Sequence, residues 1–203
     1  WKNPEATAEA YRDGWYYTGD VGLLNGDDID ESGRPKLEIV DRVKNLTELY
    51  VGGDSVWVQQ AALESNVFSS AVGIEHLCIV ADRNMGQLIA VVVPDSELLQ
   101  AAATRRGADP STLAHDALVT DRELCATLLA SLHTAAAAAA KSKKIMAYEV
   151  PSGVIIDCGP WTATNGLLTP TGKPRRDAVR KRWQGQMEAL YKEIGEQTAA
   201  KDT

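Results

Sequence analysis

Two short apolar segments in the middle of the chain restrict its fold more than any other feature. The first covers residues 71–81 and contains Cys78-Ile79-Val80; the second covers residues 87–93 and is stopped by Pro94. Both are rich in residues that favour strands, and a proline at the end cannot continue a sheet ladder. Turn-forming residues at 82–86 (DRNMG) separate them. The sequence therefore predicts a β-hairpin at this point.

The other segments mix helices with short strands. Apolar spacing predicts four helices, at residues 58–68, 96–106, 111–140 and 177–194. Three more strands are expected, at residues 36–42, 48–51 and 149–156. Residues 1–36 read as strands and loops, with the acidic stretch 25–36 as an exposed loop. Because strands and helices do not alternate regularly, the predicted fold class is α+β.

Composition excludes some classes of function. The 203 residues are 44% hydrophobic and 24% charged, which suits a globular protein of one or two domains. A net charge of −7 argues against broad nucleic-acid binding, which needs many cations over phosphates. No apolar run approaches the roughly 20 residues needed to span a bilayer. The chain starts at Trp1 without an initiator Met or a secretory signal, so we interpret it as a fragment.

The three cysteines do not suggest a metal site. Cys78, Cys125 and Cys158 are odd in number and far apart, and the three histidines lack ligand spacing. No metal ligands are therefore assigned. Buried free thiols in a reducing, intracellular compartment are the expected state.

The first candidate motif is the segment Asp13–Asp20 (DGWYYTGD). Gly19 allows a sharp backbone turn, and Asp20 offers two acceptor oxygens that could hold a pair of vicinal hydroxyls. A ribose presents such a pair to an acidic residue in dinucleotide-binding folds. The alternative is an Asp that simply favours a turn.

The second candidate motif is residues 39–45 (IVDRVKN), followed by Gly52-Gly53. In a strand, Arg42 and Lys44 share one face and could meet a phosphate or a carboxylate. They could equally be a solvated strand edge. The glycine pair could permit close approach of a ligand to the backbone, or only make a turn.

The third candidate motif is residues 165–176 (NGLLTPTGKPRR), which is not a P-loop. A P-loop needs Gly where the chain has Leu167, and Ser or Thr where it has Pro174. What remains is Lys173 after a glycine turn, before a basic helix. Several cations gather here and could bind phosphates or simply be solvated: Lys173, Arg175, Arg176, Arg180, Lys181 and Arg182.

Taken in order, these segments resemble the motifs of one family. Residues 1–7 (WKNPEAT), Asp13-Gly14-Trp15 and Tyr17-Thr18-Gly19-Asp20 resemble consecutive signature motifs of the adenylate-forming superfamily. That superfamily contains acyl-CoA synthetases, adenylation domains of peptide synthetases, and luciferases. Residues 39–45 resemble its hinge motif.

The end of the chain continues the resemblance. Gly172-Lys173 resembles the final lysine motif of the superfamily, and residues 165–171 (NGLLTPT) are similar to the form seen in long-chain acyl-CoA synthetases. The resemblance covers residues 1–183. One departure is residues 56–64 (VWVQQAALE), where most relatives have an apolar-Pro or small-residue turn followed by a Glu that begins the helix. This puts the local CoA contacts in doubt.

The resemblance implies a reaction in two steps. A carboxylate attacks ATP to give an acyl-adenylate and pyrophosphate, and the CoA thiol then displaces AMP. Lys173 would be the lysine of the first step, since a fixed ammonium stabilises charge at the α-phosphate. At about 4 Å and an effective dielectric of 20, a pair of unit charges interacts by about 4 kcal/mol. That corresponds to roughly a thousandfold in rate.

The resemblance also implies the other site roles. Asp20 would hold the ribose hydroxyls of ATP, and Arg42 would help to bind the nucleotide. Lys44 would be the hinge about which the small domain rotates between the two steps. The backbone at Gly52 and Gly53 would lie near the pantetheine arm of CoA.

The implied domain organisation divides the chain at Lys44. Residues 1–43 would be the β-rich tail of the large N-terminal domain, and residues 44–203 the mobile C-terminal domain. ATP, Mg²⁺ and CoA would serve the full-length enzyme, and none would bind tightly to this chain. Its partner would be the missing large domain, which in the family holds the ATP phosphate loop and the acyl tunnel. The chain alone would be inactive.

Two alternatives to a long-chain fatty acid–CoA ligase remain. Another adenylate-forming enzyme would use a different acid or the thiol of a carrier protein. A non-catalytic interaction module could keep the fold, although it would not need Asp20, Arg42, Lys44 and Lys173. The full-length enzyme would be cytoplasmic or peripheral on an internal membrane.

Overall fold

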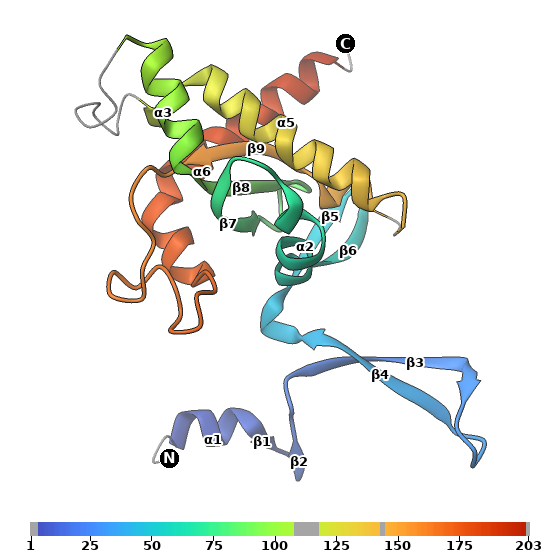
Figure 1. Cartoon of the computed structure of the whole chain (residues 1–203). Coiled ribbons are helices and arrows are strands. Elements are labelled where there is room, and N and C mark those ends of the chain that lie inside the picture. The colour runs from blue at the N-terminus through green and yellow to red at the C-terminus, as the bar shows by residue number, and fades with distance from the viewer. Residues whose placement is uncertain (1–3, 108–117, 143–144, 202–203) are drawn as a thin grey trace. The chain divides into compact units, whose positions relative to one another are not determined.

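The computed structural model describes residues 4–107, 118–142 and 145–201. The chain divides into two units, Trp1–Thr47 and Glu48–Thr203, which we call the first and second unit. Figure 1 colours both along the chain. The division falls a few residues beyond the boundary expected at Lys44. Short sheets and separate helices make up the described elements, which confirms the α+β class.

The first unit consists of a short helix and two β-hairpins. Helix α1 (Pro4–Ala10) precedes β1 (Tyr11–Arg12) and β2 (Trp15–Tyr16), which pair with each other. The long hairpin joins β3 (Asp20–Ile29) to β4 (Pro35–Arg42). The strands and loops predicted for this region are therefore present, together with one helix of seven residues.

Apart from Asp30, the described side chains of the acidic stretch 25–36 are exposed, as predicted. The prediction of a loop is wrong, because residues 25–29 and 35–36 extend the β3–β4 hairpin. An ion pair across the strands, 2.6 Å between Lys36 Nζ and Asp28 Oδ1, offsets the acidic charge there. The turn itself is held by Asp30, whose Oδ1 accepts from the backbone N–H groups of Ser32 (2.8 Å) and Arg34 (3.0 Å). These local hydrogen bonds lower the pKa of Asp30, with the Ser32 hydroxyl contributing most.

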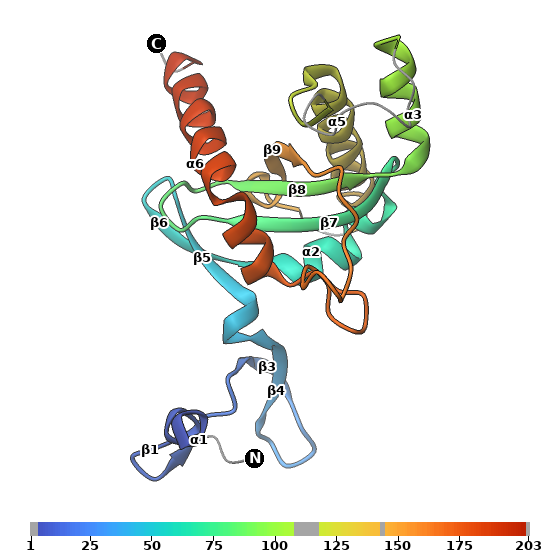
Figure 2. The same cartoon turned by 90° about the vertical axis from the view of Figure 1, so that its left-hand side faces the viewer.

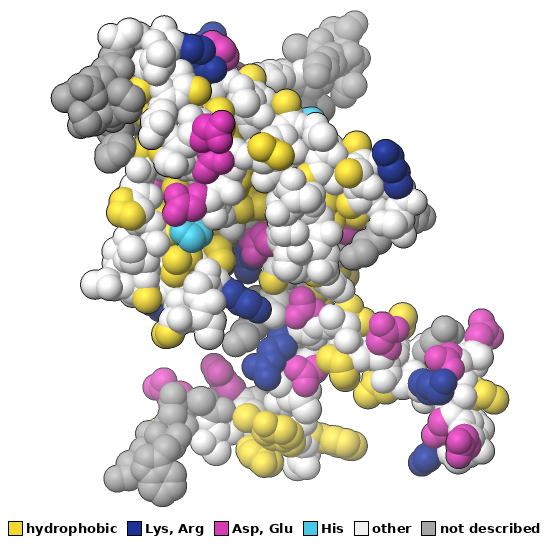
Figure 3. Space-filling view, in the orientation of Figure 1, with side chains coloured by type: hydrophobic (Ala, Val, Ile, Leu, Met, Phe, Trp, Pro, Cys, Tyr) yellow, Lys and Arg dark blue, Asp and Glu magenta, His cyan; other side chains and the backbone are white. Residues whose placement is uncertain are grey.

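The first unit has no core of its own. None of its side chains whose exposure is described is buried. Figure 3 shows apolar atoms at its surface. Its exposed large apolar side chains are those of Tyr11, Trp15, Tyr16, Tyr17, Leu23, Leu24, Ile29, Leu37, Ile39, Val40 and Val43. Isolated hairpins are marginal in water, and so many exposed apolar side chains indicate a surface that interacts with another part of a protein.

The second unit is built on a three-stranded sheet. Its strands are β7 (Ile74–Ala81), β8 (Leu88–Pro94) and β9 (Pro151–Ile156), in the order β7-β8-β9. Strand β7 pairs antiparallel with β8, which confirms the predicted hairpin, and β8 pairs parallel with β9. A two-stranded sheet precedes it, formed by β5 (Leu46–Val51) and β6 (Asp54–Gln59).

Helices cover both faces of the three-stranded sheet (Figures 1 and 2). Helices α2 (Gln60–Asn66), α3 (Ser96–Arg105) and α5 (Arg122–Ala139) lie on one face, and α6 (Arg176–Lys201) lies on the other. The described residues also include three short 3₁₀ helices: η1 (Val43–Asn45), η2 (Phe68–Ser70) and η3 (Ala147–Glu149). No helix in the described ranges is both long and apolar enough to cross a membrane.

Alternation along the strands divides the second unit into two apolar clusters. Ile79 and Ala81 of β7 face α2 and α5, whereas Cys78 and Val80 face α6. A strand that points successive side chains to opposite faces needs apolar residues at every position when both faces are covered. This explains why the central segments are continuous apolar runs.

Helix ends follow the usual capping chemistry. Asp95 caps α3 by accepting from the Leu98 N–H, and Asp121 caps α5 by accepting from the N–H groups of Glu123 and Leu124. The alanine run closes α5 as predicted, with Ala135 and Ala136 buried. The predicted start of this helix, residues 111–117, lies outside the described residues.

Three helix boundaries differ from the prediction. The helix expected at residues 111–140 is interrupted at Thr120 and Asp121, and α5 begins only at Arg122. The helix expected at residues 58–68 begins only at Gln60, because Val58 belongs to β6. The basic helix extends beyond residue 194 and is kinked at Trp183, where φ is −109° and ψ is 18°.

The cysteines are free thiols, as expected. Cys78 and Cys158 are buried and Cys125 is half-buried. Burial raises the pKa of the Cys78 thiol to about 12 and that of Cys158 to about 11. Neither is an activated nucleophile, which would need a lowered pKa.

Candidate functional site

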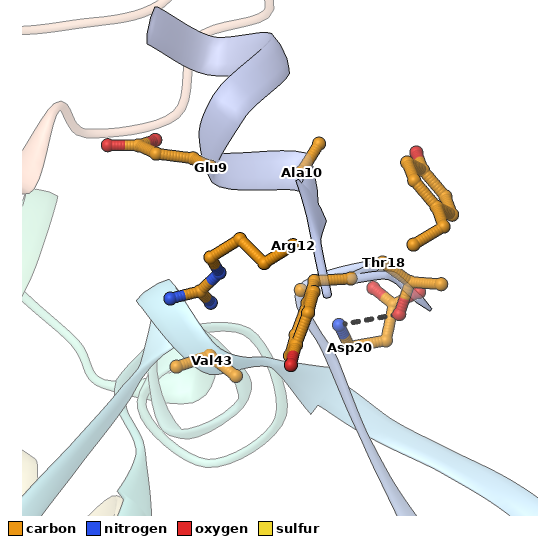
Figure 4. Close-up of a pocket in the computed structure, with 9 residues that line it drawn as sticks. Glu9, Ala10, Arg12, Thr18, Asp20 and Val43 are labelled. Carbon is orange, nitrogen blue, oxygen red and sulfur yellow. Dashed lines mark hydrogen bonds between the residues drawn. The ribbon is translucent and has the colours of Figure 1, made fainter. Parts of the chain in front are cut away.

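A pocket of about 600 Å³ lies in the first unit and contains Asp20 (Figure 4). Its lining comes from the end of α1, the short β1–β2 hairpin, the segment leading into β3 and the start of η1: Glu9, Ala10, Arg12, Tyr16, Tyr17, Thr18, Gly19, Asp20 and Val43. It thus combines a carboxylate, a guanidinium, aromatic rings and backbone groups. Such a set can bind a ligand that carries hydroxyls, a planar ring and negative charge.

Asp20 and Arg42 are brought together by the register of the long hairpin. They are direct cross-strand partners, and Arg42 Nε lies 3.4 Å from Asp20 Oδ1. Both side chains are open to solvent, 60% for Arg42 and 31% for Asp20. An exposed pair of this kind adds little to stability, so both groups remain available to a ligand.

The backbone around Asp20 is fixed locally. Gly19 adopts a φ of +74°, a conformation that L side chains rarely adopt. The Asp20 N–H donates to Thr18 Oγ1 at 3.1 Å (Figure 4), and the Val43 N–H donates to the Gly19 carbonyl at 2.8 Å. The turn therefore sets where the Asp20 carboxylate lies at the pocket wall.

Arg12 was not predicted as a site residue. Its guanidinium lies 4.4 Å from the centre of the Tyr17 ring, a cation–π contact, and its side chain extends toward Val43 (Figure 4). In the sequence, the one feature that points to Arg12 is its place just before the Asp13-Gly14 turn. The turn closes the β1–β2 hairpin, in which Arg12 is paired with Trp15.

Lys44 is the middle residue of η1, between β4 and β5. The residues on either side of this single turn, Arg42 and Leu46, are extended, with φ/ψ of −86°/143° and −92°/137°. One 3₁₀ turn between two extended segments is a point where a few torsions determine the direction of the chain. The structure describes the backbone here, and the hinge role itself stays a prediction.

Lys173 lies on a tight turn formed by residues 167–175, which we call the lysine turn. Leu168 and Pro174 form a β-bridge, and the Thr169 N–H donates to the Lys173 carbonyl at 2.7 Å. In return the Lys173 N–H donates to Thr169 Oγ1 at 3.1 Å. Gly172, with a φ of +79°, allows the chain to reverse.

The Lys173 side chain is exposed. Within the described residues, no carboxylate lies within ion-pair distance of its ammonium. Buried Leu167 and Leu168 anchor the start of the turn in the cluster under α6. The backbone of the turn is therefore fixed, while its ammonium is free to meet an external anion.

Gly52 and Gly53 form the two-residue turn between β5 and β6. Their φ values are +61° and +95°, and two consecutive residues with positive φ are what such a hairpin requires. A Cβ at either position would meet nothing within 4 Å, so the space beside them is open. The turn explains the glycines, and the open space leaves room for a ligand. Contact with CoA stays a prediction.

The predicted site residues thus fall into separate groups. Asp20, Arg42 and Lys44 belong to the first unit, whereas Gly52-Gly53 and Lys173 belong to the second. Of these, only Asp20 and Arg42 contact each other in the described part of the chain. Among the described residues, no group of three or more His, Cys, Asp or Glu side chains is arranged so that it could hold a metal ion.

Known proteins similar to this chain form a consistent set. Fatty acyl-CoA synthetase A of Dictyostelium discoideum is 33% identical over 193 residues, which is 95% of this chain and 27% of the relative. Long chain acyl-CoA synthetase 1 of Arabidopsis thaliana is 29% identical over 96% of this chain and 27% of its own length. The chain thus spans about a quarter of the length of these relatives. No protein-family model matches it.

Solved structures similar to this chain include adenylation domains of carboxylate reductases. The adenylation domain of a carboxylate reductase from Mycobacterium chelonae superposes with a TM-score of 0.67 and 28% identity, over 94% of this chain and 25% of that one. An adenylation–carrier didomain of a carboxylic acid reductase from Segniliparus rugosus, in complex with AMP, superposes with a TM-score of 0.68 and 29% identity. The match covers 98% of this chain and 24% of that one.

In fold and in sequence, the chain resembles the C-terminal region of an adenylate-forming enzyme. Among such enzymes it is most like the fatty acyl-CoA synthetases, since its relatives include a fatty acyl-CoA synthetase, a long chain acyl-CoA synthetase and a long-chain-fatty-acid–CoA ligase.

Proposed function

We propose that this chain is part of an AMP-forming long-chain fatty acid–CoA ligase. Its full-length enzyme transfers AMP from ATP to a fatty acid, which releases pyrophosphate and gives an acyl-adenylate, and then transfers the acyl group to the thiol of CoA, which releases AMP. The single observation that supports this most is an exposed lysine on a rigid turn, in a chain whose curated relatives are long-chain acyl-CoA synthetases.

The nucleotide is proposed to bind at the pocket of the first unit. Asp20 accepts hydrogen bonds from the two ribose hydroxyls, because a carboxylate has two acceptor oxygens for a vicinal pair. Arg42, its cross-strand neighbour, exchanges part of its contact with Asp20 for the nucleotide. Mg²⁺ accompanies ATP, and no metal-binding role is assigned to residues of this chain.

Lys173 is proposed to act in adenylation. Its ammonium approaches the α-phosphate and the attacking carboxylate oxygen, where charge develops as pyrophosphate departs. Thiol attack needs no such cation, and the same ammonium would obstruct the route of CoA. The second unit therefore rotates about Lys44 between the steps and then presents Gly52-Gly53 to the pantetheine arm.

The first unit is proposed to be the tail of the large N-terminal domain. Its apolar side chains are exposed here and it has no core, so a partner surface must cover it. That partner is the large domain of the same protein, which also supplies the phosphate loop and the acyl tunnel. The chain alone therefore does not turn over. Three free thiols favour a reducing compartment, cytoplasmic or at the surface of an internal membrane.

A second candidate is an adenylation domain that transfers its acyl group to a carrier protein. The observation that favours it is the similarity to the reductase didomain, which contains such a carrier. The curated relatives favour CoA instead. Residues 56–64, next to the glycine turn, depart from the usual pattern on the proposed CoA side.

The nature of the products tests the proposal. The full-length protein is expected to show fatty-acid-dependent exchange of pyrophosphate into ATP, and to release AMP and acyl-CoA when CoA is added. Chromatography of the nucleotides and thioesters measures both. Release of ADP would contradict adenylate formation. Exchange without acyl-CoA, but with acylation of a phosphopantetheinyl carrier protein, would select the second candidate.

Replacing Asp20 tests the nucleotide site. In Asp20→Ala of the full-length enzyme, we expect the KM for ATP to rise about ten- to hundredfold, since hydrogen bonds to a charged group contribute about 1.5–3 kcal/mol. The KM for the fatty acid should stay unchanged. Glu38→Gln, an exposed carboxylate on β4, is the control. An unchanged KM for ATP in Asp20→Ala would refute the ribose contact.

A further inference from the structure

A half-buried ion pair lies next to the lysine turn. Arg176, the first residue of α6, donates from Nη2 to Glu64 Oε1 at 2.6 Å, and Glu64 belongs to α2. Their side chains are 20% and 15% exposed. The two residues are 112 positions apart, so the pair joins distant parts of the second unit.

The pair also holds the edge of the sheet. Strand β7 pairs with β8 on one side only. On its other side, the Ile79 N–H donates to Glu64 Oε1 at 2.7 Å, and Arg176 Nε donates to the Ile79 carbonyl at 3.0 Å. Each of Glu64, Ile79 and Arg176 is thus hydrogen-bonded to the other two. We call this set of three residues the edge clamp. Burial raises the pKa of Glu64, opposed by the charge and hydrogen bond of Arg176.

The edge clamp is connected to Lys173 through a short, stiff segment. Only Pro174 and Arg175 separate Lys173 from Arg176. Proline restricts φ, the bridge to Leu168 fixes Pro174, and the Arg175 N–H donates to the Leu167 carbonyl at 2.8 Å. The start of the turn is anchored by buried leucines and its end by Arg176. A shift of Arg176 would therefore move the backbone of Lys173.

We propose that Arg176, oriented by Glu64 and by the Ile79 carbonyl, is a positioning residue that sets the location of Lys173 for adenylation. This inference rests on the proposed role of Lys173. Two donor atoms of the Arg176 guanidinium are engaged within the protein: Nε donates to the Ile79 carbonyl and Nη2 donates to Glu64. Preorganised electrostatics depends on placing the charge accurately, and a misplacement of about 1 Å can cost about a hundredfold.

Two conservative variants of the full-length enzyme test this. Arg176→Lys keeps the charge but cannot reach both partners with one planar group. Glu64→Gln keeps an acceptor for Ile79 but loses the charge of the pair. We expect each to lower kcat for fatty-acid adenylation about ten- to hundredfold, leaving the KM for ATP within about twofold. Thioester formation from supplied acyl-adenylate should be unchanged.

The matched control is Arg106→Lys. Arg106 also pairs with a largely buried carboxylate, Asp121, at 2.9 Å, but it joins α3 to the start of α5, away from the lysine turn. It should leave both half-reactions unchanged. Thermal unfolding of all variants verifies that they fold. If Arg176→Lys does not fold, Glu64→Gln alone decides the outcome by the same criteria.

A double variant separates this inference from the proposed function. If Arg176 acts through Lys173, then Arg176→Lys should have no further effect on adenylation in a Lys173→Ala background. Additive losses, a parallel fall of both half-reactions, or adenylation within twofold of wild type would each overturn the positioning role. If Lys173→Ala itself leaves adenylation intact, the proposed function fails instead.

Discussion

Lys173→Ala in the full-length enzyme should lower fatty-acid-dependent pyrophosphate exchange by about 10²- to 10³-fold, the usual cost of removing one preorganised electrostatic donor. Thioester formation from supplied acyl-adenylate and CoA should be nearly unchanged. The physical reason is that charge at the α-phosphate develops only in the first step. The lysine turn holds the backbone by its own hydrogen bonds, so loss of the ammonium should not disturb it.

The control for this variant is Lys192→Ala, which removes another exposed cation, from α6. It should leave both half-reactions unchanged. Stopped assays of each half-reaction, started from ATP or from synthetic acyl-adenylate, give the two rates separately. An equal loss of both steps in Lys173→Ala would refute the assigned role.

Lys44→Pro should leave adenylation measurable but suppress transfer to CoA by about a hundredfold, the order of loss that a misplaced site causes. Proline fixes φ at its own position near −65° and also restricts Val43 before it. The single turn η1 then loses the torsional freedom that a rotation of the second unit would need. Single-turnover formation of acyl-CoA from supplied acyl-adenylate measures the effect.

Lys44→Ala is the matched control for the hinge, since it removes the same side chain but keeps the backbone free. It should transfer the acyl group at close to the wild-type rate. Unaffected transfer in Lys44→Pro would contradict the hinge, and equal losses in both variants would show that the side chain matters instead of the backbone.

Local sequence features predicted much of the fold. The β7–β8 hairpin follows from two apolar runs around a turn, and the alanine-rich end of α5 follows from propensity. Val58 was assigned to a helix because a short apolar stretch fits both periods, and only pairing with β5 makes it a strand. The hairpin at residues 25–36 depends on pairing between β3 and β4, which the composition of this acidic segment does not reveal.

The candidate site was only partly predictable. The sequence motifs indicate Asp20, Arg42 and Lys173 as candidate site residues. They do not reveal that Asp20 contacts Arg42, because that contact depends on the register between β3 and β4. The edge clamp joins Glu64 to Arg176 across 112 positions, and no local pattern carries that information. From the sequence, the cations near Lys173 could bind phosphates or be solvated. In the structure, one of them, Arg176, donates instead to the Ile79 carbonyl and to Glu64.

The edge clamp has one more consequence, for solubility. An open strand edge can recruit a strand from another molecule and so begin aggregation. At Ile79 both outward backbone groups are already occupied by Glu64 and Arg176. An incoming strand would have to displace an ion pair before it could form its first hydrogen bond here. Glu64 and Arg176 thus oppose self-association at the part of this edge where the strand residues, 77–81, are all apolar.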